Sequence, residues 1–162
     1  MTVSPTATTA PHNRLRILFV DDEQHLREFM RTELPRLGHE VTVCADCQSG
    51  IEMVKKAVFD AAILDMRMEH ENAGLRVLSA LKQVSPDTEA VIMTGYGSTE
   101  TAVEALRLGA FDYLTKPCKL TDIEALLIRI QEKRKLKNRA AALESRVQAA
   151  EGPYGLIGSS PA

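Results

Sequence analysis

The chain has 162 residues, a size that suggests one domain with extensions. Its hydrophobic content of 44%, charged content of 26% and net charge of −2 are ordinary for a globular protein, and they exclude a general attraction to nucleic acid or membrane surfaces. No apolar stretch approaches the roughly 18 residues that a membrane-spanning helix needs. The expected location is the cytoplasm.

The N-terminal segment, residues 1–13, is rich in Thr, Ala and Pro. It lacks the basic start and the apolar stretch of a secretory signal. We therefore predict a disordered tail that precedes the folded domain.

Five apolar runs recur along the chain, and each is followed by a segment with helical periodicity. The runs lie at residues 15–20, 41–44, 61–64, 90–93 and 111–114, and the helical segments at 23–34, 49–58, 75–84, 98–108 and from 120 onward. Pro35 should end or bend the first helix, and Gly109 should end the fourth. Short continuous apolar runs are typical of strands buried on both faces, so this alternation predicts an α/β fold with a doubly wound, five-stranded parallel sheet.

The three cysteines are too few for a disulfide framework. Cys44 and Cys47 form a C-x-x-C, but no second pair of ligands accompanies them. We interpret them as a cysteine that ends a strand and one near the next helix. A redox or metal role for the pair is the weaker alternative.

The last helical segment runs from Leu120 to near Glu151 and carries two apolar stripes. The first is predicted to pack on the sheet and comprises Leu120, Ile123, Leu127 and Ile130. The second repeats at spacings of four and three and comprises Leu136, Ala140, Leu143, Val147 and Ala150. It predicts a linker helix over residues 128–151 that dimerises as a short coiled coil, with a frayed single helix as the alternative.

A basic run occupies residues 133–139 of this helix. We interpret it as a solvated helix face, because no DNA-reading motif accompanies it. Direct DNA binding by this part of the chain is therefore not expected, nor is membrane binding.

Polar side chains follow the predicted strands at the edge where ligands bind in open parallel sheets. Asp21 and Asp22 follow the first strand, Asp65 the third, Thr94 the fourth and Lys116 the fifth. Crowded carboxylates repel one another, and Mg²⁺, which prefers oxygen ligands, would relieve that repulsion. A carboxylate beside such an ion and a lysine can attack phosphorus and form an aspartyl phosphate.

Four motifs resemble those of one known family. They are I-L-F-V-D-D-E at Ile17–Glu23, A-A-I-L-D-M-R-M at Ala61–Met68, V-I-M-T-G-Y-G at Val91–Gly97 and G-A-F-D-Y-L-T-K-P at Gly109–Pro117. By these motifs residues 14–127 resemble the receiver domain of bacterial response regulators in two-component systems. The resemblance implies a flavodoxin-like sheet of strand order 2-1-3-4-5, phosphorylated by a sensor histidine kinase and without enzymatic activity beyond its own phosphotransfer and dephosphorylation.

The resemblance also implies roles for the acidic residues. Asp65 would be the phospho-acceptor. Asp22 and Asp65 would bind Mg²⁺ directly and Asp21 through water, and the backbone carbonyl of Arg67 would complete the protein ligands.

A switch is implied by the same resemblance. Lys116 would pair with the phosphoryl group and precede Pro117 in a cis peptide. The Thr94 hydroxyl would bond a phosphoryl oxygen on activation, and Tyr113 would then turn inward and reposition the helix at residues 98–108. The alternative for Tyr113 is a strand-edge aromatic whose hydroxyl stays in solvent.

One loop departs from the family pattern. The family has Pro four residues after the acceptor and Gly eight after it, whereas this chain has Glu69 and, nine residues on, Gly74. The loop at residues 66–73 is therefore longer and more acidic. We expect its conformation and the rate of dephosphorylation to differ, without an effect on the acceptor or its partners.

Residues 154–162 resemble the opening of the AAA+ ATPase module of sigma-54-dependent activators of the nitrogen-regulatory type. We therefore predict that residues 152–162 begin such a module, which the receiver would control. No Walker motif is present, so we expect no ATP hydrolysis by this chain. Two alternatives are a module that acts by docking alone and a phosphohydrolase, which would need an acid at position 67, where the chain has Arg67.

Overall fold

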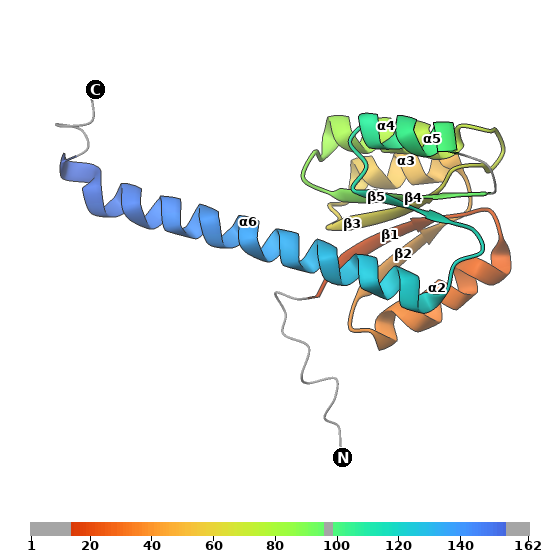
Figure 1. Ribbon diagram of the computed structural model, residues 1–162, viewed down its shortest axis with the longest axis horizontal. Coiled ribbons are helices and arrows are strands. Elements are labelled where there is room, and N and C mark those ends of the chain that lie inside the picture. The colour runs from red at the N-terminus through yellow and green to blue at the C-terminus, as the bar shows by residue number, and fades with distance from the viewer. Residues whose placement is uncertain (1–13, 96–98, 155–162) are drawn as a thin grey trace, which may run out of the picture. The chain divides into compact units, whose positions relative to one another are not determined.

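The computed structural model describes residues 14–95 and 99–154, with side chains of the last helix up to Glu144 (Figure 1). The predicted tail at residues 1–13 and most of the predicted module start, residues 155–162, lie outside the described residues. Strands and helices alternate in the order β1 (Arg16–Val20), α2 (Gln24–Arg36), β2 (Glu40–Cys44), α3 (Cys47–Lys56), β3 (Ala61–Asp65), α4 (Ala73–Val84), β4 (Glu89–Thr94), α5 (Thr99–Arg107), β5 (Asp112–Thr115) and α6 (Leu120–Tyr154).

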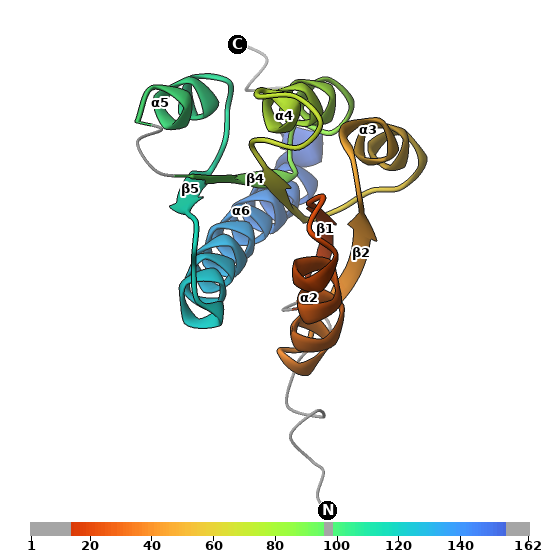
Figure 2. The same cartoon turned by 90° about the vertical axis from the view of Figure 1, so that its right-hand side faces the viewer.

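The five strands form one parallel sheet in the order β2-β1-β3-β4-β5. Helices α3, α4 and α5 cover one face, and α2 and the first turns of α6 lie on the other (Figure 2). The predicted flavodoxin-like order 2-1-3-4-5 is therefore confirmed. All carboxyl ends of the strands meet at one edge, where the polar residues of the motifs follow them.

The central strands are buried on both faces, as their apolar runs predict. Every residue of β3 and of β4 is buried. On one face Leu18, Leu64 and Ile92 pack against α4 in a single core cluster. Because side chains alternate along a strand, the intervening residues such as Phe19 and Ile63 fill the opposite face.

Several helix boundaries differ from the sequence prediction; α6, for example, continues to Tyr154 rather than ending near Glu151. Helix α3 begins at Cys47 because Asp46 caps it: its Oδ1 accepts a hydrogen bond of 2.8 Å from the Ser49 backbone N–H, while the Ser49 hydroxyl accepts one from the Asp46 N–H. Pro35 lies inside the last turn of α2, and the helix ends at the next residue, Arg36. Gly38, at a φ of 95°, then turns the chain, a conformation that glycine adopts without strain.

The chain divides into two compact units between Leu127 and Ile128, within α6. Ile123 and Leu127 are buried, whereas Leu136 and Leu143 of the second unit are exposed. Among the described residues, no helix combines the length and apolar character that crossing a membrane requires.

Helix α4 approaches the backbone after Asp65 so closely that only glycine fits at its second position. The Gly74 N–H donates a 3.0 Å hydrogen bond to the Met66 carbonyl. A Cβ at Gly74 would lie 2.5 Å from the Asp65 carbonyl oxygen and 2.9 Å from the Met66 Cα. Both neighbours are backbone atoms, which cannot rotate away.

We expect Gly74→Ala to lower the free energy of unfolding by about 1–3 kcal/mol, since the added methyl group overpacks rigid backbone. Urea unfolding measures the change. Gly95→Ala is the matched control, because a Cβ there meets nothing within 4 Å. An equal effect of the two substitutions would contradict the steric argument.

Candidate functional site

Asp21 lies at the turn that follows β1 and is fully buried. Its Oδ1 accepts a 2.8 Å hydrogen bond from the Glu23 N–H, and the Arg27 Nη1 donates to its carbonyl oxygen at 3.0 Å. Asp65 ends β3 and is only 4% exposed, whereas Asp22 is exposed. The sheet edge thus holds two buried carboxylates and a third at the solvent boundary.

The three carboxylates form a cluster of oxygen donors. Single oxygens of Asp21, Asp22 and Asp65 all lie within 4.8 Å of one another. The Asp21 Oδ2 is buried, and the Lys116 ammonium lies 3.0 Å from it. A cluster of carboxylate oxygens suits a hard dication such as Mg²⁺, so the residues present fit the predicted ion.

Lys116 supplies the positive charge of the site. Its Nζ lies 3.0 Å from the Asp21 Oδ2 and 3.2 Å from the Asp65 Oδ2, and its side chain is 22% exposed. Burial alone would lower the pKa of Lys116, but the ion pairs with Asp21 and Asp65 outweigh burial and raise it. The ammonium therefore stays charged and bridges the two buried carboxylates.

One ammonium does not balance this negative charge. Burial, followed by repulsion from Asp21, raises the pKa of Asp65 from 3.8 to about 6, although Lys116 acts in the opposite direction. The site therefore favours a further cation or a proton.

The remaining predicted residues surround this cluster. Thr94 ends β4 beside Asp65, is buried, and its Oγ1 makes a long 3.5 Å contact with the Leu114 carbonyl. Its own carbonyl accepts a 2.6 Å hydrogen bond from the Lys116 N–H. The Lys116–Pro117 peptide is cis, as predicted. Lys116 also lines an open pocket together with Glu23, His25, Leu26, Gly95, Pro117 and Cys118.

Tyr113 and Arg67, the other two predicted site residues, have exposed side chains. Tyr113, on β5, is 41% exposed. The exposed Arg67 side chain lies 3.7 Å from that of Glu71. The roles predicted for the Tyr113 ring and the Arg67 carbonyl stay predictions.

Sequence reasoning missed a role of Glu69. Its carboxylate accepts the Cys47 N–H at 3.1 and 3.3 Å and so satisfies a free donor in the first turn of α3. Local spacing carries no signal for this contact, because the two residues are 22 positions apart. Glu69, at which the loop departs from the family pattern, therefore also connects the loop to helix α3.

Residues 17–128 match the family described as response regulator receiver domain. The transcriptional regulatory protein ZraR of Escherichia coli (strain K12) is 34% identical over 151 residues, which cover 93% of this chain and 33% of that protein. The alginate biosynthesis transcriptional regulatory protein AlgB of Pseudomonas aeruginosa is 34% identical over 154 residues, covering 95% and 34%. The chain spans about a third of the length of these curated relatives.

Solved structures of proteins at 31% and 32% identity are also similar to this chain. NtrX from Brucella abortus superposes with a TM-score of 0.74 at 31% identity, covering 82% of this chain and 31% of that one. The separate receiver domain of NtrX from Brucella abortus superposes with a TM-score of 0.66 at 32% identity, covering 72% and 98%.

The raised pKa of Asp65 predicts how stability depends on pH. The folded state binds the proton more tightly than the unfolded state, so metal-free stability falls as the pH rises from about 4 to about 6. We expect Asp65→Asn, which cannot ionise, to stabilise the metal-free protein at pH 7.5 by about 1–2 kcal/mol after allowance for solvent screening.

Urea unfolding in EDTA at pH 7.5 and at pH 4 tests this expectation, and the gain should largely vanish at pH 4. If Asp65→Asn were less stable than the wild type at pH 7.5, burial and repulsion from Asp21 would not explain the raised pKa of Asp65.

Proposed function

The chain belongs to the response regulator receiver domain family, and on that premise we propose that it is a signalling switch in which Asp65 accepts a phosphoryl group. The observation that carries the proposal is the bridge from Lys116 to Asp21 and Asp65 at the carboxyl edge of the sheet. The bridge supports the proposal because a carboxylate can attack phosphorus and a neighbouring ammonium can pair with phosphoryl oxygens.

Asp21, Asp22 and Asp65, with the Arg67 carbonyl, would hold Mg²⁺. The bound ion would neutralise the oxygens of the incoming phosphoryl group. The cluster of carboxylate oxygens and the raised pKa of Asp65 support this assignment.

The phosphoryl donor in the proposed reaction is a phosphohistidine of a sensor kinase. An Asp65 carboxylate oxygen attacks phosphorus, the new O–P bond forms, and the P–N bond to histidine breaks. The histidine nitrogen takes up the bonding electron pair and then a proton. Lys116 pairs with the transferred oxygens, while the Asp21 carboxylate remains as its second partner.

The conformational change of the switch follows from the negative charge that phosphorylation adds. A phosphoryl group brings about −1.5 to −2 charges to Asp65. The Thr94 hydroxyl, which makes a long 3.5 Å contact with the Leu114 carbonyl, turns toward that charge. Tyr113 turns inward into the space released, and α5 and β5 shift with it. The change is a shift in population between two states of one fold.

We infer one partner that acts before this switch in the signal and one that acts after it. A histidine kinase supplies the phosphoryl group, and a downstream AAA+ module receives the signal. Curated relatives named as transcriptional regulators are about three times as long as the matched part, which leaves room for an output region in such proteins. We propose that the output acts on transcription through sigma-54 polymerase, by the resemblance of residues 154–162.

The second half of α6 supports a homodimer. Leu136 and Leu143 lie seven residues apart, two turns along one helix face, and are 63% and 54% exposed. Ala140, between them, is also exposed. An apolar seam of this kind is buried when two such helices pair.

Phosphorylation can be tested with Mg²⁺ and a small phosphodonor, read by intact mass. We expect the wild type to gain one phosphoryl group, Asp65→Asn to gain none, and EDTA to prevent the gain. Asp112→Asn is the matched control, because this residue starts β5 and its replacement can keep the hydrogen bond to the Tyr113 N–H. Equal modification of wild type and Asp65→Asn would refute the proposal.

Dimerisation can be tested by sedimentation with and without beryllofluoride. We expect Leu136→Glu combined with Leu143→Glu to give monomers, since buried carboxylates would face each other across the seam. Asn138→Glu, on the opposite helix face, should leave the association unchanged. A wild type that stays monomeric at high concentration under both conditions would contradict dimerisation through this seam.

A further inference from the structure

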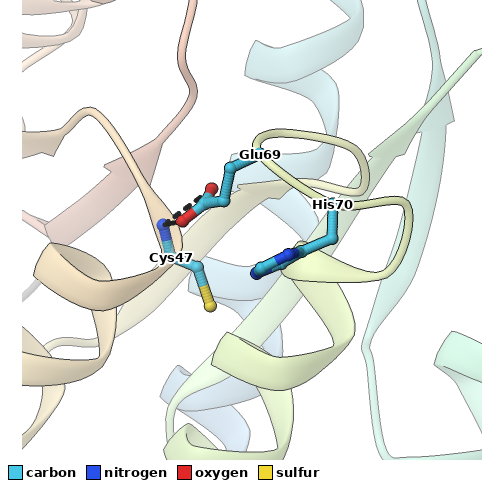
Figure 3. Close-up of side chains that lie close together, drawn as sticks. All are labelled: Cys47, Glu69 and His70. Atoms are coloured by element: carbon cyan, nitrogen blue, oxygen red, sulfur yellow. Dashed lines mark hydrogen bonds between the residues drawn. The ribbon is translucent and has the colours of Figure 1, made fainter.

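A second set of metal-ligating side chains meets at the loop between β3 and α4. Cys47 comes from the start of α3, and Glu69 and His70 come from the loop (Figure 3). One ligand atom of each lies within 4.8 Å of the other two. None of these residues belongs to the Asp21, Asp22 and Asp65 cluster.

Backbone contacts hold the three side chains together. The Glu69 carboxylate accepts the Cys47 N–H at 3.1 and 3.3 Å, which keeps it beside the thiol of the same residue. The Met68 N–H donates to the His70 carbonyl at 3.1 Å and closes a turn that carries the imidazole. The Cys47 Sγ lies 3.6 Å from the Ala73 carbonyl. The arrangement is therefore built by the fold.

The donor atoms are one sulfur, one nitrogen and one oxygen. Zn²⁺ is bound in proteins by these three ligand types, whereas Mg²⁺ and Ca²⁺ prefer oxygen alone. Zinc bond lengths of about 2.0–2.3 Å place tetrahedral ligand atoms about 3.3–3.8 Å apart. Glu69 and His70 are exposed loop residues, so a contraction of about 1 Å from the upper limit of 4.8 Å requires no change in the core.

The cluster already lies beside a positive group. The Arg76 Nη1 lies 3.1 Å from the His70 Nε2. Because a guanidinium only donates hydrogen bonds, Nε2 of the imidazole accepts in this contact. An open hollow lined by His70, Glu71, Asn72 and Arg76 joins this side of the cluster to solvent. A metal ion can enter there and replace the guanidinium.

We propose that Cys47, Glu69 and His70 bind one transition-metal dication, best matched by Zn²⁺, with water as the fourth ligand and Arg76 displaced. The sulfur–metal bond forms as the Cys47 thiol proton passes to solvent, His70 binds as neutral imidazole, and no oxidation state changes. The bound ion fastens the loop that follows Asp65 to α3. The proposal goes beyond the phosphorylation switch and does not depend on it.

The test uses Co²⁺ as a spectroscopic probe of the whole chain in excess Mg²⁺, which occupies the carboxylate cluster and is a poor partner for a thiolate. We expect a sulfur-to-cobalt charge-transfer band that saturates at one equivalent and disappears when Zn²⁺ is added. Absence of the band in the wild type would overturn the proposal.

Variants assign the band to this cluster. Cys47→Ser should abolish it, and Cys44→Ser, the same change at a neighbouring buried thiol, should leave it. His70→Ala and Glu69→Gln should each weaken binding at least about tenfold, since even outer-sphere changes cost that much. Both residues are exposed, and Gln can still accept the Cys47 N–H, so the fold should persist.

Arg76→Ala tests whether the metal ion and the guanidinium compete for the same place beside His70. The substitution should tighten binding, because the competing cation is removed. Weaker binding in Arg76→Ala, or a band that survives both His70→Ala and Glu69→Gln, would overturn the assignment.

Discussion

Repulsion between two buried carboxylates is the constraint on which the site depends. Asp21 and Asp65 share one ammonium at 3.0 and 3.2 Å, and this single charge leaves the pKa of Asp65 raised to about 6. A structure that served stability alone would have no need of such crowding. The excess negative charge favours the binding of a cation at this edge.

The sheet brings this crowding about through its layered architecture. Because β3 is buried on both faces, its one polar residue, Asp65, stands at the end of the strand, where it is still only 4% exposed. Helix α4 then begins so close to the next residues that Gly74 has no room for a side chain. Asp65 is thereby placed beside closely packed backbone, while Asp21 and Lys116 come from the ends of two other strands.

The loop after Asp65 makes two kinds of contact with helix α3 through Glu69. Glu69, which stands where the family has Pro, satisfies a backbone donor of α3 and also faces the Cys47 thiol. A proline has no side chain that could accept that hydrogen bond. Glu69 thus links the loop that follows Asp65 to helix α3. It also lies with the Cys47 thiol and the His70 imidazole in one cluster.

The sequence by itself determined the order of strands and helices, because apolar runs and helical periodicity are local patterns. It also determined which residues, Asp65 and Lys116 among them, stand at strand ends, because those positions follow from the runs. Helix ends were less predictable: the start of α3 depends on the cap by Asp46.

Only the tertiary structure decided which side chains touch. The bridge from Lys116 to Asp21 spans most of the domain in sequence, and the meeting of Cys47 with Glu69 and His70 depends on how one irregular loop folds back. Spacing along the chain led to Cys47 being interpreted with Cys44, its neighbour in sequence. Its neighbours in space come from a loop whose path no periodicity encodes, because an irregular segment takes its conformation from the elements it packs against.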